Sequence, residues 1–456
     1  MPDLSGFPYF EVQFTKDGAI ASSEQAAALK NRLLAGSTPP DLLVLAHGWN
    51  NSSEEALRLY TGLLAQLRSE MDAGHGLQGP ADCIVAGIIW PSKKFADAQL
   101  GDSAAASLSE AVTDQDLLDQ IGTLAEIFDD AEKRQKLESL KALIPKLEDS
   151  PHAQTEFADQ VRSLLGADAK EGSREDASNT FFKLSGLDLL ERLGNPADTD
   201  ETNVPGPDSG SGDDALDGLG GAADLDDSTP AGGAAGFGDF LTGIKAAARN
   251  LLNYATFYQM KDRAGTTGAS GVNPMLRELV QACPGLRIHL VGHSFGARLV
   301  TAAVAGSDTA SAIKPHSVVL LQAAFSHNGF SANFDGKGGV GAFRRVLADG
   351  LIQGPALVSY THNDRAVGLA YPLASLISGT NAAAVGDEND PFGGLGRNGA
   401  QHTAESVPGV LLGVENTYTF ERGKMYNLRA DDVVANHSDI VHPEIAHAML
   451  AAMAAH

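Results

Sequence analysis

The chain has 456 residues and a formal net charge of −25 at pH 7, with 58 acidic and 33 basic side chains. Nucleic-acid backbones and anionic membrane surfaces would repel such a chain, so neither is an expected partner. The two cysteines, Cys83 and Cys283, lie in apolar contexts, which predicts reduced, structural thiols. No basic, apolar leader and no run of membrane-spanning length is visible, so we expect a cytoplasmic protein without a transmembrane segment; export without a cleaved signal stays open.

An early apolar run, residues 42–46, predicts a parallel strand that is buried on both faces. The sequence His-Gly-Trp-Asn-Asn follows at once, at residues 47–51. Gly48 would allow the backbone to turn its amides inward. The N–H of Trp49, helped by Asn50, could then donate a hydrogen bond to a substrate oxyanion.

The residues around this loop have structural interpretations. His47 is interpreted as a packed, hydrogen-bonded loop residue rather than a second base. Ser52 followed by Glu54 and Glu55 predicts a capped helix start. A second apolar run, residues 84–89, predicts another core strand.

A long insertion is predicted between this strand and the C-terminal part of the chain. Apolar residues recur at helical spacing in 117–128, 137–147 and 181–190, which predicts helices that form a cap over the site. The third helix could line an acyl pocket or simply pack on its neighbours. Helical spacing resumes at residues 240–254 and returns the chain to the core.

The composition changes within the insertion. From Leu193 to Ile244 there is no Lys or Arg, while acidic residues are frequent among Gly, Ser, Pro and Ala. Such a segment buries too little apolar surface to offset the entropy of ordering, so we predict a disordered acidic loop over 196–235. A calcium site is the alternative, but the carboxylates have no fixed ligand spacing. The loop could also dock a protein partner.

Residues 292–296 read Gly-His-Ser-Phe-Gly and lie between a strand-like apolar run and a helix-like run. This context is typical of a nucleophile elbow. Gly292 and Gly296 would leave room for the sharp turn, and Ser294 would stand clear of the sheet edge. The N–H of Phe295 would point toward an oxyanion. A surface loop that matches the short pattern by chance is the alternative.

Downstream of this turn the sequence predicts, in order, a strand (317–325), a short helix (340–348) and a second strand (356–360). A serine nucleophile needs a base and an orienting acid. Hydrolases with a nucleophile elbow supply these residues in the chain order Ser, Asp or Glu, His. Asp364 lies just past the second strand, at the carboxyl edge where open α/β sheets collect functional groups, and is the predicted acid. His362 and Asn363 are alternatives, and Asp364 could instead be a turn residue.

The last predicted strand covers 425–428, with a ragged extension to 434. A loop follows, and Pro443 opens a final helix. His437 lies in this loop and is the predicted base. Its competitors are His442, next to the start of the helix, and His447, one turn inside it.

The elbow at Ser294, the His-Gly-Trp loop, Asp364 and His437 together resemble the α/β-hydrolase fold, in particular bacterial serine esterases and lipases. The resemblance covers about two thirds of the chain, in residues 8–92 and 272–456. It implies a mostly parallel sheet flanked by helices, a covalent acyl-enzyme and no cofactor. The substrate is not implied, because this fold supports many chemistries. No internal repeat and no zinc-ligand spacing is found in the sequence.

The expected organisation is therefore an α/β-hydrolase core in two parts, residues 1–92 and 261–456, with a helical cap at 93–260. The expected function is hydrolysis of carboxylic esters that carry an apolar part, by an esterase, a lipase or a thioesterase. A hydrolase scaffold that has lost its activity and serves as a binding or regulatory module is the alternative. A second alternative places the distinctive function in the acidic loop, as an interaction arm.

Overall fold

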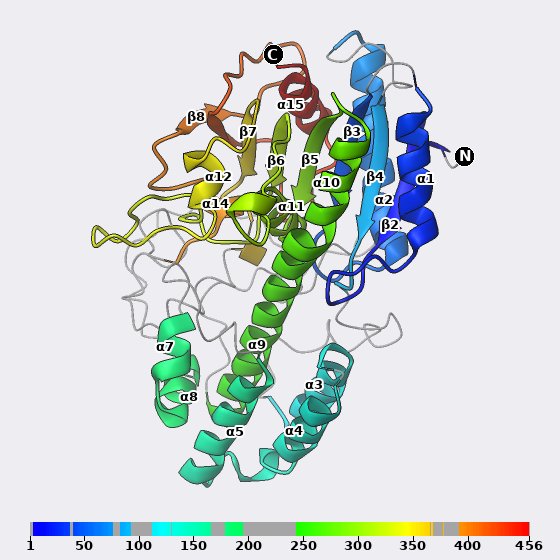
Figure 1. Cartoon of the computed structure of the whole chain (residues 1–456). Helices are drawn as coiled ribbons and strands as arrows, with labels where there is room; N and C mark the ends of the chain where they lie inside the picture. Colours follow the sequence, from blue (N-terminus) through cyan, green and yellow to red (C-terminus); the bar gives the residue numbers. More distant parts are fainter. Residues whose placement is uncertain are drawn as a thin grey trace, which may run out of the picture.

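The computed structural model describes residues 3–36, 40–75, 83–92, 112–128, 130–165, 178–194, 243–364, 366–367, 377 and 392–455. The strands are β1 (Asp3–Leu4), β2 (Phe7–Gln13), β3 (Asp41–Ala46), β4 (Cys83–Ile89), β5 (Arg287–His293), β6 (Ser317–Leu321), β7 (Ala356–Tyr360), β8 (Ser406–Val410) and β9 (Met425–Arg429). They form a nine-stranded sheet in the order β1-β2-β4-β3-β5-β6-β7-β9-β8 (Figure 1). All neighbouring pairs are parallel except β1 and β2. The predicted α/β class with a mostly parallel sheet is confirmed.

Both faces of the sheet are covered by helices, so the central strands are buried on both sides. On one face, α2 (Ser53–Asp72) and α15 (Pro443–Ala454) pack on side chains such as Leu43 and Leu45. On the other, α1 (Ser23–Leu34), α10 (Asn273–Ala282), α11 (Phe295–Ala305) and α12 (Arg344–Ala348) pack on the alternating set, which includes Leu42 and Val44. This alternation is the two-residue period of a strand. It explains why the core strands read as continuous apolar runs.

The helices of the insertion form a separate group. They are α3 (Asp114–Ile127), α4 (Ala131–Lys141), α5 (Pro151–Leu164), α7 (Ser178–Lys183), α8 (Gly186–Gly194) and α9 (Ile244–Thr266). Figure 1 shows α9 running from this group toward the sheet, where a π-helical segment (Thr267–Val272) links it to α10. The buried residues of the group are continuous with one face of the sheet core. The predicted acidic loop, 196–235, lies outside the described residues.

Several predicted boundaries differ from the structure. β6 ends at Leu321 instead of continuing to 325, because Gln322 has a left-handed φ of 42° that breaks the extended backbone. The predicted helix at 340–348 begins only at Arg344. The strand at 425–428 reaches Arg429 but has no extension to 434. A short helix, α14 (Leu395–Asn398), and the half-exposed edge strand β8 were not predicted.

Other local predictions are confirmed. Ser52 caps α2 and Glu55 completes a capping box with it. Cys83 and Cys283 are buried and free, and burial raises the pKa of Cys83 to about 12. Within the described residues, none of the helices combines the length and apolar character needed to cross a bilayer.

The strand order places the functional loops. From β3 the chain moves to β4 on one side, whereas β5, β6 and β7 extend the sheet on the other side of β3. The chain connections that leave the carboxyl ends of β3 and β5 therefore run to opposite sides of the sheet. In open α/β sheets a crevice forms at such a point, outside the carboxyl ends of the strands, and ligands bind there. The loop 47–51 and Ser294 follow these two strands directly.

Candidate active site

Ser294 stands at a sharp turn between β5 and α11. Its backbone has φ 56° and ψ −123°, a strained combination for a residue with a Cβ. Hydrogen bonds hold it there: its N–H donates to the carbonyl of Leu321, and its own carbonyl accepts from the N–H groups of Ala297 and Ala324. The neighbouring strand β6 and the first turn of α11 thus fix the position of the serine hydroxyl.

The glycines of the elbow are required by close packing. A Cβ on Gly292 would lie 2.3 Å from the carbonyl oxygen of Gly296, and one on Gly296 would lie 2.1 Å from that of Ala46. Because these contacts are with backbone, no side-chain movement could relieve them. The structure therefore gives the physical reason for the Gly-x-Ser-x-Gly spacing in this chain.

Ser294, His437 and Asp364 form a continuous chain of hydrogen bonds. The Oγ of Ser294 lies 2.8 Å from Nε2 of His437, and Nδ1 of the same ring lies 2.8 Å from Oδ2 of Asp364. Asp364 is fully buried, and its other oxygen, Oδ1, accepts the N–H of Val367 at 2.9 Å. With a proton on Nδ1, the ring donates to the carboxylate and Nε2 can accept the serine proton.

His293 links this chain to the elbow. It is buried, and its Nε2 donates to the carbonyl oxygen of His437 at 2.9 Å. Burial, together with the neighbouring ring of His437, lowers the pKa of His293 to about 3, so it is neutral at physiological pH. The sequence drew attention to this position only as part of the pentapeptide. Its hydrogen bond forms only because the folded chain brings residue 437 back to the end of β5. No local sequence pattern indicates such a long-range contact.

The predicted alternatives to the triad residues lie elsewhere. His362 pairs with Asp431, with Nδ1 3.0 Å from Oδ2, and the Asn363 amide donates to backbone carbonyl groups. The Nε2 of His442 lies 2.7 Å from Asp439. His447 contacts Glu70 on α2. The structure therefore brings His437 to the hydroxyl of Ser294 and Asp364 to the far side of the His437 ring, whereas His362, Asn363, His442 and His447 have other partners.

The loop after β3 lies against Ser294. A Cβ on Gly48 would be 2.8 Å from Cβ and 3.4 Å from Oγ of Ser294, so only glycine allows this approach. Trp49 is buried, with its ring centroid 5.9 Å from that of Phe295. The N–H of Phe295, at the first position of α11, belongs to the amides that have no acceptor within their own helix. The N–H of Asn50, by contrast, donates to the carbonyl of Ser92. The N–H groups of Trp49 and Phe295, on the two loops beside Ser294, are the candidate oxyanion donors.

His47 is a packed structural residue, as predicted. It is fully buried, donates from Nδ1 to the carbonyl of Gly48 and stacks on Trp90 at 5.7 Å between ring centroids. Burial lowers its pKa to about 4. A neutral imidazole in this position fixes the loop through its hydrogen bond and its contact with Trp90.

The strained backbone expected at Ser294 has counterparts after two neighbouring strands, and these two were not anticipated from the sequence. Asn50 after β3, Ser294 after β5 and Gln322 after β6 all have positive φ, and all are buried. Gln322 is held through its side chain, which accepts from Ser359 and donates to the carbonyl of Gly396. Strained non-glycine residues of this kind cluster at functional sites. The signal is backbone geometry, which residue types alone do not reveal.

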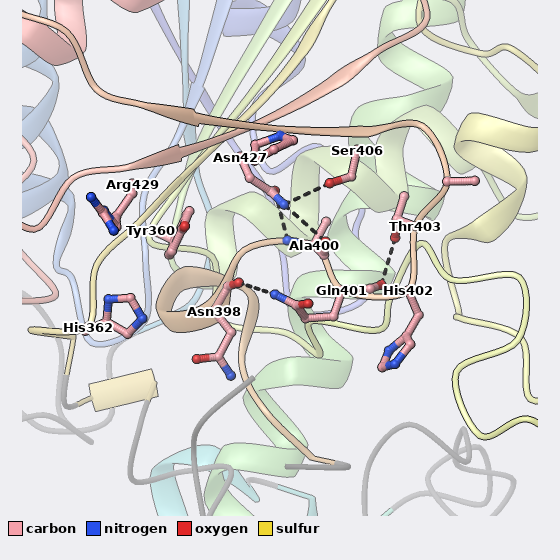
Figure 2. A pocket seen from close by; sticks show the side chains of 12 residues that line it. Tyr360, His362, Asn398, Ala400, Gln401, His402, Thr403, Ser406, Asn427 and Arg429 are labelled. Atoms are coloured by element: carbon pink, nitrogen blue, oxygen red, sulfur yellow. Dashed lines mark hydrogen bonds between the residues drawn. The ribbon is translucent and has the colours of Figure 1, made fainter. Parts of the chain in front are cut away.

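A polar pocket of about 710 Å³ lies near the carboxyl ends of β7 and β9 (Figure 2). Its lining includes Tyr360, His362 and Arg429 but not Ser294 or His437. The amide of Asn427, in its wall, is already bonded to Ala400 and Ser406. The amide of Asn427 is therefore satisfied by its neighbours in the wall, and Ser294 does not line the pocket. For these reasons the pocket is not assigned to the candidate active site.

Comparisons of the chain with protein-family models, curated proteins and solved structures found no match.

Proposed function

We propose that this protein is a serine hydrolase of the α/β-hydrolase fold that cleaves carboxylic esters through an acyl-enzyme. The observation that carries the proposal is the hydrogen-bonded chain Ser294–His437–Asp364, with both links at 2.8 Å. Its position at the carboxyl ends of parallel strands, after an elbow with strained backbone, supports the same conclusion.

The reaction follows from these positions. Ser294 Oγ attacks the acyl carbon while Nε2 of His437 takes the hydroxyl proton, and buried Asp364 stabilises the imidazolium that forms. The tetrahedral oxyanion accepts hydrogen bonds from the N–H groups of Phe295 and Trp49. His437 then donates its proton to the leaving alkoxide as the carbon–oxygen bond breaks. In the second half, His437 removes a proton from water, whose oxygen attacks the acyl carbon. The imidazolium then returns the proton to Oγ of Ser294 as the bond between Oγ and the acyl carbon breaks and the acid leaves.

The substrate proposed here carries an apolar part. Phe257 of helix α9 packs on Phe295 at 5.1 Å between ring centroids, and Trp49 packs on the same ring at 5.9 Å. The surroundings of the serine are thus aromatic, and helix α9 of the insertion lies against them. Aromatic and aliphatic walls favour an apolar acyl or alcohol group over a charged one. Thioesters with an apolar acyl group fit the same chemistry.

The test is labelling with a fluorophosphonate probe, which reacts covalently with activated serines. The parent protein should take up the label and Ser294→Ala should not. A series of nitrophenyl esters of increasing acyl length then measures the size of the acyl pocket. Absence of label from folded parent protein would contradict the proposal and favour a binding module. Ser438→Ala, at a partly buried residue directly after His437, is the matched control and should label normally.

A partner at residues 196–235 remains a prediction, since this segment lies outside the described residues. Deletion of the segment should leave ester hydrolysis intact if it serves only for docking.

A further inference from the structure

We propose that the protein binds a divalent transition-metal ion, represented in the test by Zn²⁺, between α2 and α15. The ligands are Glu70, His75 and His447, which offer one ligand atom each within 4.8 Å of the others. Two imidazoles and a carboxylate are a donor set that suits zinc. These residues are not part of the hydrogen-bonded triad, and the proposal does not depend on hydrolase activity.

The end of α2 builds half of the site. The N–H of His75 donates to the carbonyl of Glu70, and the N–H of Gly74 donates to that of Met71, both at 3.0 Å. With Gly74 at φ 93°, these bonds form a Schellman ending, which returns the chain over the last turn of the helix. The turn places Nδ1 of His75 2.8 Å from Oε2 of Glu70. The two ligands are therefore held together by backbone before any ion binds.

His447 supplies a buried lone pair from α15. Its Nε2 lies 2.7 Å from the carbonyl oxygen of Asn416, and because a carbonyl only accepts, Nε2 carries a proton. In the neutral ring, Nδ1 is then an acceptor. This atom is buried without a hydrogen-bond donor and lies 3.3 Å from Oε2 of Glu70. Two acceptors facing each other in a buried site require a cation between them.

The geometry suits a metal ion better than a single proton. Both histidines converge on the same carboxylate oxygen, Oε2 of Glu70. Ligands about 2.0–2.2 Å from a tetrahedral zinc ion lie roughly 3.3 Å apart, which matches the contact of His447 with Glu70 at 3.3 Å. The 2.8 Å between His75 and Glu70 is a direct hydrogen bond, and this distance must lengthen when the ion takes the place of the proton. The carbonyl on the second ring nitrogen of His447 is a frequent outer partner of a metal-binding histidine. The His75 side chain is 37% exposed, so a fourth position can reach solvent.

A bound ion would connect two helices that are distant in sequence. Glu70 lies at the end of α2 and His447 in the last helix of the chain, on the same face of the sheet. Because metal binding requires the folded arrangement, it adds its free energy to folding. We therefore expect the metal to raise the stability of the whole chain.

The test uses the full-length protein, stripped with a chelator and then dialysed against Zn²⁺ alone. We expect one zinc ion retained per chain and a rise in Tm of about 3 °C at a zinc concentration of about 100 times the Kd. Co²⁺ in place of Zn²⁺ should give visible absorption bands of a four- or five-coordinate site. No retained metal and an unchanged Tm would overturn the proposal and leave a protonated His447 as the cation.

Variants assign the ligands. His447→Gln and His75→Gln should both lose the retained zinc and the zinc-dependent rise in Tm. Because His75 is partly exposed, His75→Gln should keep the Tm of the chelated parent, which separates loss of metal from loss of fold. His152→Gln changes an exposed histidine beside Glu156 and should bind zinc like the parent. Equal zinc retention by the parent and both ligand variants would also overturn the proposal.

Discussion

Replacement of Asp364 by Asn tests the proposed triad at its most constrained atom. In the folded protein, Oδ1 of Asp364 accepts the N–H of Val367, and Oδ2 faces Nδ1 of His437. An asparagine must keep its carbonyl oxygen toward Val367, since its NH₂ group cannot accept that hydrogen bond. The NH₂ group then points at Nδ1 of His437 and donates to it. The ring is forced to carry its proton on Nε2, facing Ser294, and can no longer act as a base.

The expected loss in kcat is about 10⁴-fold, or ~5.5 kcal/mol of transition-state stabilisation, the size associated with a triad histidine in the wrong tautomer. Hydrolysis of a nitrophenyl ester measures it, and the rate of fluorophosphonate labelling should fall with it. Asp41→Asn is the matched control, because Asp41 faces Nε2 of His289 at the opposite edge of the sheet. A folded Asp364→Asn protein whose kcat stays within about tenfold of the parent would refute the assigned role.

Three further predictions concern stability. Gly296→Ala should destabilise the fold by about 2–4 kcal/mol and abolish labelling, because its Cβ would lie 2.1 Å from the Ala46 carbonyl oxygen; a fully labelled variant would contradict this. Tyr60→Phe should cost about 2–3 kcal/mol in urea unfolding, since the hydroxyl accepts from the His47 N–H and donates to a β4 carbonyl. The free energy of unfolding should also fall by roughly 3–4 kcal/mol between pH 7 and pH 5 because of His293 and His47 alone. In the unfolded chain both histidines bind protons near pH 6.5, whereas in the folded chain their pKa values are about 3 and about 4, so both stay neutral at pH 5. A His293→Asn protein with an unchanged pH slope would contradict that attribution.

Sequence reasoning reached those parts of the site that have local signals. Ser294 is recognisable because an apolar strand precedes it and a helix follows, and Asp364 and His437 because each follows a core strand in the expected chain order. The structure places all three in one chain of hydrogen bonds. The chain order Ser, Asp, His limits the acid and the base to a few nearby residues each. The geometry of the folded chain is needed to distinguish among them.

The features that were missed arise from contacts between distant segments. Glu70 and His447 come from helices near opposite ends of the chain, and neither helix alone has the spacing of a metal motif. The strained φ of Gln322 depends on its side-chain bonds to Ser359 and Gly396. The edge strand β8, which contains Pro408 and is half exposed, lacks the apolar run that marks the core strands.

The hydrogen bond from His293 to the carbonyl of His437 has a consequence for turnover. It joins the residue directly before the nucleophile to the backbone of the base, so the loop cannot shift without breaking a bond to the elbow. Nucleophile and base behave as one rigid unit whose spacing is set when the chain folds. Under the proposed function, an arriving ester would meet reacting groups that are already aligned, and little of its binding energy would be spent on bringing them together.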